Sequence, residues 1–168
     1  PLLAELPFEQ RLVPTAAASG CYVIDRRSGH RVPVATAWSS ELSRHELDDL
    51  FSTTVAAALA ADVLVVTNPL PGDILPPQFY RDLVADTRSA GTPVLVDLSS
   101  PRLDAALLGQ PDLVKLNDWE LAQYVVGPFD SDDERESAVA ALRAAGAQSV
   151  IVTRGGSARR RIGVGLVV

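Results

Sequence analysis

The sequence predicts an α/β fold in which a mostly parallel, doubly wound sheet is preceded by a small β-hairpin. Short apolar runs with the length of buried strands alternate with helix patterns along most of the chain, which is typical of strand–helix–strand units. Hydrophobic residues make up 47% of the 168 residues but aromatic residues only 5%, as expected for a sheet core of Val, Leu and Ala. We therefore expect a β-rich segment at residues 1–38 and a partial α/β core at residues 39–168.

The β-rich segment contains two apolar runs on either side of a polar turn. Residues 21–24 and 31–35 flank the turn Asp-Arg-Arg-Ser-Gly, which predicts an antiparallel hairpin. Pro33 makes the second run an edge strand or the site of a bulge. Cys21 is the only cysteine, so we expect a small buried side chain, no disulfide framework and a reducing, cytoplasmic compartment.

The first half of the core is predicted from a helix cap and a buried strand. Ser43 and Glu46 have the spacing of a capping box, so a helix should begin there and continue to about Ala60. Residues 62–67 form an apolar run of the length of a buried strand. The helix after it should end at Gly91, because glycine is favoured just beyond a helix.

The second half of the core continues the alternation of strands and helices. We expect, in order, a strand at 93–97, a short helix with Pro101 in its first turn, a strand at 113–115, a helix at 117–126, a helix capped by Ser131 and Glu134 that ends at Gly146, and a strand at 150–153. With the strand at 62–67, these make four strands joined by helices, as a mostly parallel sheet requires.

Charge and hydropathy exclude two classes of partner. The net charge of −6 argues against a nucleic acid, and the one basic cluster, Arg154 with residues 159–161, is interpreted as a solvated tail. No apolar run is long enough to span a membrane, and nothing resembles a secretory signal. The chain has no methionine and ends inside an apolar run, so we expect it to be a fragment of a longer protein.

The most informative segment is residues 111–120, Pro-Asp-Leu-Val-Lys-Leu-Asn-Asp-Trp-Glu. Lys115 ends a predicted strand, and Asn117 and Glu120 open the next helix, at an edge of the sheet where phosphates and their metal ions bind. Capping alone would explain Asn117 and Glu120, since the same spacing occurs at two other helix starts. Lys115 favours the phosphate interpretation, in which Glu120 would hold magnesium, and the two roles are compatible.

Two other strand ends carry candidate site residues. Thr153 precedes Gly155 and Gly156, whose backbone could approach an anion, although an ordinary turn explains two glycines equally well. The loop at residues 67–73 follows one strand, and Asp97 is the last residue of another. Each could belong to a binding site or have only a structural role. We assign no role to His30 or His45, and we interpret Trp119 as a packing residue.

In combination, these motifs resemble those of the PfkB, or ribokinase-like, carbohydrate kinases, and among them the 1-phosphofructokinase-like hexose kinases. The resemblance extends from about Val13 to Ala158. It rests on three segments. Residues 111–121 are similar to the family's Lys-Pro-Asn-x-x-Glu segment, and the strand leading into Thr153-Arg154-Gly155-Gly156 resembles the family's nucleotide loop. The hairpin resembles the family's lid over the sugar.

The resemblance implies a ribokinase-like fold and ATP-dependent phosphorylation of a sugar or sugar phosphate. Lys115 and Asn117 would approach the nucleotide phosphates, Glu120 would organise Mg²⁺, and Thr153, Gly155 and Gly156 would line the nucleotide site. The resemblance also suggests a homodimer formed through the lid.

The chain departs from the family pattern in ways that bear on activity. Pro69 stands where many relatives have a serine near the sugar, and the Gly-Ala-Gly-Asp-like segment that supplies the catalytic aspartate is absent from this sequence. We therefore assign no catalytic residue and expect the chain to be inactive by itself. Two alternatives remain open: a non-catalytic nucleotide-binding module, and a scaffold that dimerises through the hairpin.

Overall fold

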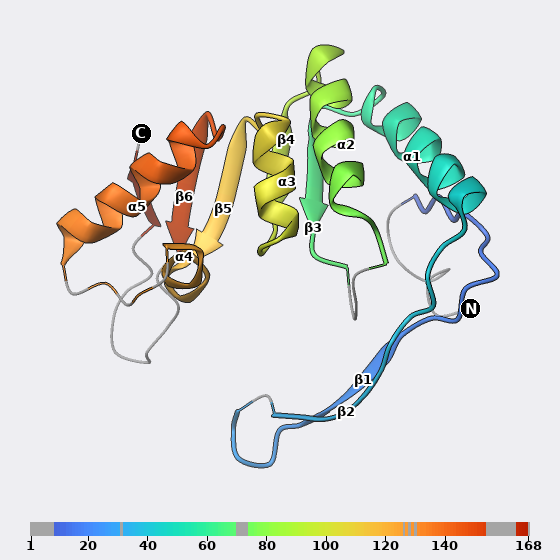
Figure 1. Cartoon of the computed structure of the whole chain (residues 1–168), viewed down its shortest axis with the longest axis horizontal. Helices are drawn as coiled ribbons and strands as arrows, with labels where there is room; N and C mark the ends of the chain where they lie inside the picture. Colours follow the sequence, from blue (N-terminus) through green and yellow to red (C-terminus); the bar gives the residue numbers. More distant parts are fainter. Residues whose placement is uncertain are drawn as a thin grey trace.

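A five-stranded sheet forms the centre of the structure, and a two-stranded hairpin projects from one end of it (Figure 1). The computed structural model describes residues 9–30, 32–69, 74–125, 127, 129 and 131–153, together with the backbone of residues 164–167. The sheet contains, in spatial order, β3 (Leu64–Thr67), β4 (Val94–Asp97), β5 (Leu113–Asn117), β6 (Ser149–Thr153) and β7 (Val164–Val167).

The first four strands of the sheet run parallel, and β7 pairs antiparallel with β6. The predicted mostly parallel sheet is therefore confirmed. Strand β7 was not predicted, because its short Val-Gly-Leu-Val run follows an arginine cluster, contains a glycine and carries a weak strand signal.

Within the described residues, five helices connect the strands, close to their predicted positions. They are α1 (Arg44–Ala58), α2 (Pro77–Ser89), α3 (Arg102–Leu108), α4 (Asp118–Val125) and α5 (Asp132–Ala144). The capping box of Ser43 and Glu46 is present at the start of α1. Gly91 and Gly146 follow α2 and α5 with positive φ angles of 93° and 135°, as predicted for residues beyond a helix end.

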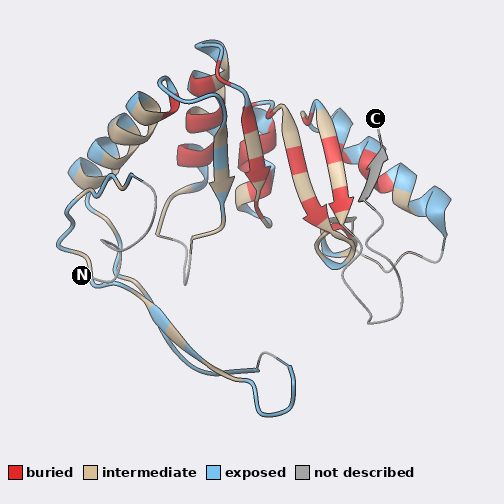
Figure 2. Cartoon of the chain, turned by 180° about the vertical axis from the view of Figure 1, so that it is seen from behind, coloured by how far each residue is buried: buried red, intermediate tan, exposed pale blue. Residues whose placement is uncertain are grey.

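The helices α2, α3 and α5 lie on the same face of the sheet, as the front and rear views show (Figures 1 and 2). Side chains alternate along β4, β5 and β6 between this covered face and the opposite one. The covered face is buried, whereas Val65 on the opposite face is 53% exposed and Leu95 and Ile151 are half-buried. Within the described residues, the sheet therefore has one covered and one open face.

The core between the sheet and its helices is built almost entirely from aliphatic side chains, which confirms the prediction from composition. Tyr80 is the one aromatic residue among the largest fully buried side chains of the described part. The aliphatic members of that set are Leu98, Leu103, Leu107, Leu116, Leu121, Leu142, Val84, Val94, Val96, Val114 and Val150.

The hairpin consists of β1 (Cys21–Asp25) and β2 (Val32–Ala37). The strands are antiparallel, and the register shifts so that Val23 pairs with Ala35 but Ile24 pairs with Pro33. Of the two alternatives expected for Pro33, an edge strand or a bulge, the structure thus has the irregularity next to Pro33. Cys21 is exposed, so the prediction that it is buried was wrong. An isolated two-stranded hairpin has no second layer packed against it, so its apolar side chains remain in contact with solvent.

Glu46 links the segment that precedes β1 to the start of α1. One carboxylate oxygen accepts a hydrogen bond of 2.6 Å from the backbone N–H of Ala16, and the other accepts bonds of 2.7 Å from the N–H and the hydroxyl of Ser43. The Ser43 hydroxyl, followed by the two backbone N–H groups, lowers the pKa of Glu46 below its ordinary value. Ser39 and Ser40 add hydrogen bonds to Gly20 and Ala18, so the base of the hairpin is held by Glu46 together with these two serines.

Among the described helices, none is both long and apolar enough to cross a membrane.

Candidate functional site

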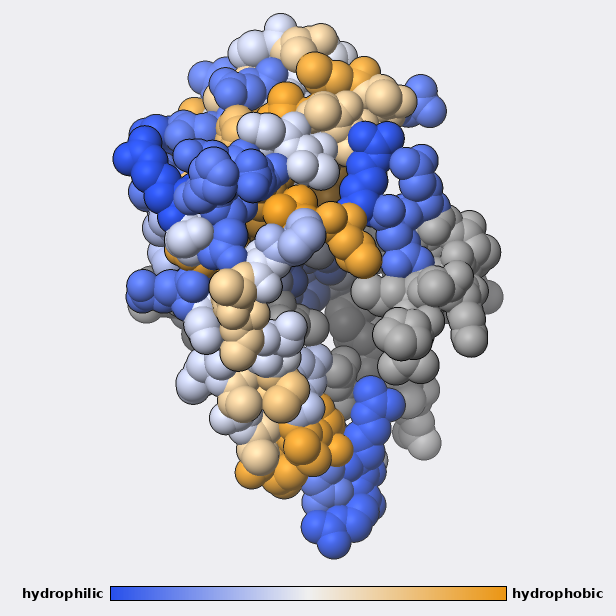
Figure 3. All heavy atoms as spheres, turned by 90° about the vertical axis from the view of Figure 1, so that its right-hand side faces the viewer, coloured by the Kyte–Doolittle hydropathy of each residue, from blue (hydrophilic) through white to orange (hydrophobic). Residues whose placement is uncertain are grey.

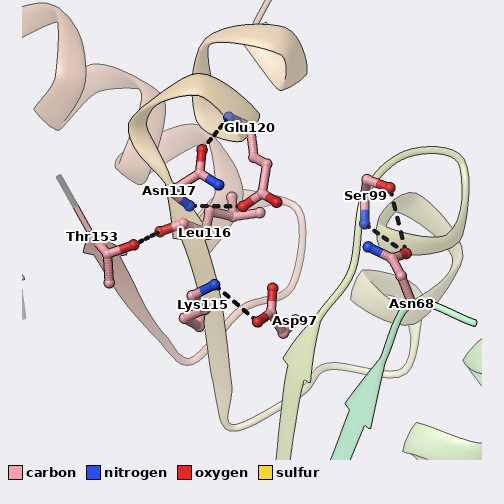
Figure 4. Close-up of polar contacts among 8 residues, drawn as sticks. All are labelled: Asn68, Asp97, Ser99, Lys115, Leu116, Asn117, Glu120 and Thr153. Carbon is pink, nitrogen blue, oxygen red and sulfur yellow. Dashed lines mark hydrogen bonds and ion pairs between the residues drawn. The ribbon is translucent and has the colours of Figure 1, made fainter. Parts of the chain in front are cut away.

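The strand β5 continues through Asn117, two residues further than the sequence predicted, and α4 begins directly after it. Asn117 pairs with Thr153 of β6 in the parallel ladder. The β-ladder hydrogen bonds thus extend past Lys115, while the helix cap that was expected at Asn117 still forms. Asn117 therefore belongs to both elements and lies where the carboxyl end of β5 meets the amino end of α4 (Figure 4).

Asn117 and Glu120 cap α4 reciprocally. The N–H of Glu120 donates to Oδ1 of Asn117 at 2.9 Å, and the N–H of Asn117 donates to Oε2 of Glu120 at 2.8 Å. Oε1 of Glu120 accepts no hydrogen bond from any described residue. The capping interpretation is therefore correct, and it leaves one carboxylate oxygen of Glu120 available to a cation.

Lys115 forms an ion pair with Asp97, its Nζ lying 2.9 Å from Oδ2 of the carboxylate. The register that pairs Leu95 with Leu113 and Val96 with Val114 brings these two side chains together on the open face of the sheet. The two side chains are 31% and 32% exposed. Both residues stand out in the sequence as strand ends, but their contact depends on the pairing of β4 with β5.

Thr153 lies on the neighbouring strand, at the same edge of the sheet. Its hydroxyl donates to the carbonyl oxygen of Leu116 at 3.3 Å and so ties the end of β6 to β5. The structure brings Lys115, Asn117, Glu120 and Thr153 together at the ends of two adjacent strands (Figure 4). Gly155, Gly156 and the arginine cluster lie outside the described residues.

Asn68 connects the ends of β3 and β4. Its Oδ1 accepts hydrogen bonds from the N–H of Ser99 at 3.2 Å, the hydroxyl of Ser99 at 3.4 Å and Nη1 of Arg102 at 3.1 Å. The sequence is compatible with either a site role or a stiff turn for the loop after β3, and it does not single out Arg102. The only signal in the sequence was that Asn68 and Ser99 each follow a strand.

Arg135 holds the start of α4 against α5. Its Nε lies 3.1 Å from Oδ1 of Asp118, its Nη1 donates to Asp132, and its guanidinium lies 5.4 Å from the centre of the Phe129 ring. Asp118 immediately follows Asn117, so this contact fixes the position of the helix start that carries the site.

A cavity of about 800 Å³ lies beside α4, which is large enough for a small ligand. Its lining includes Glu120 and Trp119, and Trp119 is 67% exposed, so its interpretation as a packing residue of the first turn of the helix was wrong. A residue in the first turn of a helix at the rim of a sheet can face solvent even when it is apolar. Burial, and to a lesser extent the Asp104 carboxylate, raises the pKa of Tyr124 in the same lining.

The residues present suit a phosphate-bound magnesium ion better than a metal held by protein ligands alone. Among the described residues, no group of three or more His, Cys, Asp or Glu side chains is close enough together to hold a metal. Mg²⁺ keeps several waters and commonly takes one or two carboxylates together with phosphate oxygens. One free carboxylate oxygen at a helix amino end, near a lysine, matches that requirement.

These features define an α/β protein in which a lysine, a helix amino end and an unbonded carboxylate oxygen lie at the carboxyl ends of parallel strands, the edge where ligands of open α/β sheets commonly bind. Residues 13–158 match the description "pfkB family carbohydrate kinase", and the chain belongs to that family. It is 30% identical over 115 residues to the 1-phosphofructokinase of Haemophilus influenzae, covering 68% of this chain and 36% of that protein. It is 25% identical over 159 residues to the D-tagatose-1-phosphate kinase of Klebsiella oxytoca, covering 82% and 52%. The chain thus spans about a third to a half of the length of these relatives.

Solved structures agree with the family assignment. The tetrameric inhibited form of phosphofructokinase-2 from Escherichia coli has a TM-score of 0.62 at 26% identity, with 81% of this chain and 44% of that chain covered. The ribokinase of Arabidopsis thaliana, complexed with ribose and ATP, has a TM-score of 0.58 at 17% identity and covers 91% and 50%. The ribokinase-like fold, with its mostly parallel sheet and separate hairpin, is therefore confirmed.

Proposed function

We propose that this chain carries the nucleotide-phosphate and magnesium part of a kinase that transfers the γ-phosphoryl group of ATP to a sugar or sugar phosphate. The observation that supports this most strongly is the placement of Asn117 and Glu120 at the start of α4, directly after the strand that carries Lys115. Family membership and the names of the two curated relatives support the sugar-kinase class.

Each residue has a role that its position supports. The Lys115 ammonium would exchange Asp97 for a phosphate oxygen and neutralise negative charge. The capped amino end of α4 favours an anion through its helix dipole. Thr153 and, beyond the described residues, Gly155 and Gly156 would line the nucleotide. Glu120 would hold Mg²⁺ through Oε1, directly or through water, and the ion would neutralise charge that develops on the transferred phosphoryl group.

The substrate is proposed as a sugar or sugar phosphate of the kind named for the relatives. The segment expected to supply a general base is absent from this sequence, and phosphoryl transfer to a hydroxyl needs such a group. We therefore expect the 168-residue chain, purified by itself, to bind MgATP without phosphorylating fructose 1-phosphate or fructose 6-phosphate. Turnover of either sugar at a normal kinase rate would contradict this part of the proposal.

Isothermal titration of the chain with ATP, with and without Mg²⁺, tests the proposal. We expect measurable binding that strengthens when Mg²⁺ is present, because Glu120 and the phosphates share the ion. A chain that binds neither ATP nor MgATP would favour the scaffold alternative. Binding of MgATP by a full-length gene product without any turnover would favour the non-catalytic module.

The hairpin supports a second proposal, that two copies of the protein pair through it. Val23, Val32 and Val34 are 56%, 47% and 59% exposed, which is unusual for a hairpin that remains single in water. Figure 3 shows hydrophobic side chains gathered on the lower part of the molecule, where the hairpin extends. Light scattering should give a dimer mass that Val34→Lys reduces to the monomer mass; a monomer at all concentrations would contradict pairing.

A further inference from the structure

A groove between α1 and α2 has an apolar floor. Phe51 of α1 and Phe79 of α2 meet edge to face there, with ring centres 5.5 Å apart and ring planes at 88°. Phe79 is buried, whereas Phe51 and Leu47 are half-buried, so part of the apolar surface of α1 stays open to a partner. The groove has a volume of about 550 Å³ and lies at the β3 end of the structure, away from the start of α4 (Figure 1).

The rim of this groove carries an excess of negative charge. Its carboxylates are those of Asp48 on α1 and of Asp82 and Asp86, one turn apart on α2. The cation among the described lining residues, Arg44, lies 4.0 Å from Asp48. Oδ1 of Asp82 accepts from Arg81 at 2.8 Å, and the Asp86 carboxylate accepts from no described residue. Asp86 and the second oxygen of Asp82 are therefore available to a cation.

A partner that complements this groove carries several cationic side chains next to an apolar one. Three consecutive cations occur once in this sequence, in residues 159–162, Arg-Arg-Arg-Ile. Guanidinium groups suit both parts of the groove, because they pair with carboxylates and also lie against aromatic rings. The segment lies outside residues 13–158, which match the carbohydrate kinase family. The complementarity is therefore a property of this chain rather than of the shared family pattern.

The arginine segment cannot reach the groove of its own chain. Thr153 of β6 pairs with Val164 of β7, so residues 154–163 leave and return at the same end of β6. Half of such a segment extends about 17 Å when fully stretched. The first and fourth strands of the sheet, β3 and β6, already lie about 14 Å apart, and α1 lies still further from β6, beyond β3 (Figure 1). The groove is therefore within reach only of the arginine segment of another copy.

We propose that the groove between α1 and α2 binds residues 159–162 of a second copy of this chain. The guanidinium groups pair with Asp82 and Asp86, and the Ile162 side chain lies against the apolar floor. Two unlike surfaces meet in this contact, so it joins copies head to tail and differs from symmetrical pairing through the hairpin. The contact uses none of the residues proposed to bind the nucleotide, and it is independent of the proposed function.

A synthetic peptide of residues 156–163 with blocked ends, Gly-Ser-Ala-Arg-Arg-Arg-Ile-Gly, is the probe. It is titrated into the whole chain and followed by nuclear magnetic resonance, which detects the weak binding that exposed ion pairs imply. We expect the backbone signals of Phe51, Phe79 and Asp86 to shift, and the dissociation constant to rise with added NaCl. A peptide with Ile162→Ser should bind more weakly, because its apolar contact is lost.

Charge removal on the chain tests the acidic rim. Asp82→Asn combined with Asp86→Asn should raise the dissociation constant of the peptide about fivefold, since two exposed ion pairs are lost. Asp133→Asn combined with Glu136→Gln removes two exposed charges from α5 and is the matched control, which should leave the constant unchanged. Equal effects of the two double variants would overturn the proposal, because they would show that only the net charge of the chain attracts the peptide.

The contact between two copies is tested by raising the concentration of the chain itself. Val34→Lys is used as the background, so that pairing through the hairpin does not contribute. The groove signals should shift as the concentration rises, and replacing Arg159, Arg160 and Arg161 together by glutamine should abolish that shift. The proposal is overturned if the peptide shifts no groove signal, or if the glutamine variant shifts with concentration as its parent does.

Discussion

The side chain of Asn117 accepts from the backbone of Glu120 at 2.9 Å, and the side chain of Glu120 accepts from the backbone of Asn117 at 2.8 Å. This reciprocal cap uses one carboxylate oxygen of Glu120 and leaves the other unbonded by the described residues. Glu120 can therefore cap α4 and bind a metal ion at the same time. A suitable substitution can remove one of these two roles and keep the other.

Glu120→Gln should weaken Mg²⁺-dependent ATP binding by about tenfold or more, because the amide carries no charge to attract the ion. Unfolding by urea should show a loss of less than about 1 kcal/mol, since the glutamine oxygen still accepts from Asn117. Ser131→Ala is the matched control: it removes the N-cap of α5, and should cost about 1 kcal/mol while ATP binding stays unchanged. If both substitutions change ATP binding equally, Glu120 acts only as a helix cap and does not bind the metal ion.

Lys115→Met should lower ATP affinity by about tenfold or more, because a charge-assisted contact with a phosphate is lost. The ion pair with Asp97 is about one-third exposed, so the change in unfolding free energy should stay within about 1 kcal/mol. Titration calorimetry and urea unfolding measure the two quantities. Unchanged ATP affinity would exclude Lys115 from the nucleotide site.

Asp97→Asn gives the converse test of the same pair. Without the competing carboxylate, Lys115 is free for phosphate, so metal-free ATP should bind more tightly than it does to the parent. A weaker affinity for metal-free ATP would mean that Asp97 holds Lys115 in a position the nucleotide requires.

The attachment of the hairpin should depend on pH through Glu46. Folding lowers the pKa of the Glu46 carboxyl. Its contribution to the stability of the folded state is therefore fully present above the unfolded pKa of about 4.3, and it is lost as the pH falls through the pKa of the folded state. The protection factor of the Ala16 amide, which donates to Glu46, should fall at acidic pH in the parent once the exchange rate is corrected for the intrinsic pH dependence of amide exchange. Glu46→Gln should remove that fall, and a parent protection factor that is the same on both sides of this range would contradict the account.

The turn after α5 should tolerate no side chain at Gly146. A Cβ there would lie 2.0 Å from the carbonyl oxygen of Leu107, and the φ angle of 135° is itself unfavourable for other residues. Gly146→Ala should cost more than about 3 kcal/mol in urea unfolding. Gly91→Ala, with a φ of 93° but no atom within 4 Å of its Cβ, should cost only about 1 kcal/mol. Similar losses would mean that the contact with Leu107 relaxes easily.

Features set by local sequence were predictable, and features set by the pairing of distant segments were not. The cap at Asn117 and the turn glycines at Gly91 and Gly146 follow from residues three or four positions apart. The Lys115–Asp97 ion pair needs the register of β4 and β5, and the orientation of Asn68 needs Ser99 and Arg102, which lie 31 and 34 residues away.

Exposure was the least predictable property of single residues. Cys21 and Trp119 are apolar by type, yet both lie where no further layer covers them. An alternating or helical pattern shows which face of an element is apolar, but the packing partner of that face comes from elsewhere in the fold.

Paramagnetic broadening by Mn²⁺, which takes the same oxygen ligands as Mg²⁺, tests the central claim most directly. With ATP present, substoichiometric Mn²⁺ should broaden the backbone signals of Asn117, Glu120 and Thr153 first, and Glu120→Gln should abolish this selectivity. Broadening centred instead on the acidic first turn of α5, Asp132–Glu134, or spread evenly over surface carboxylates, would contradict a nucleotide–metal site at the start of α4.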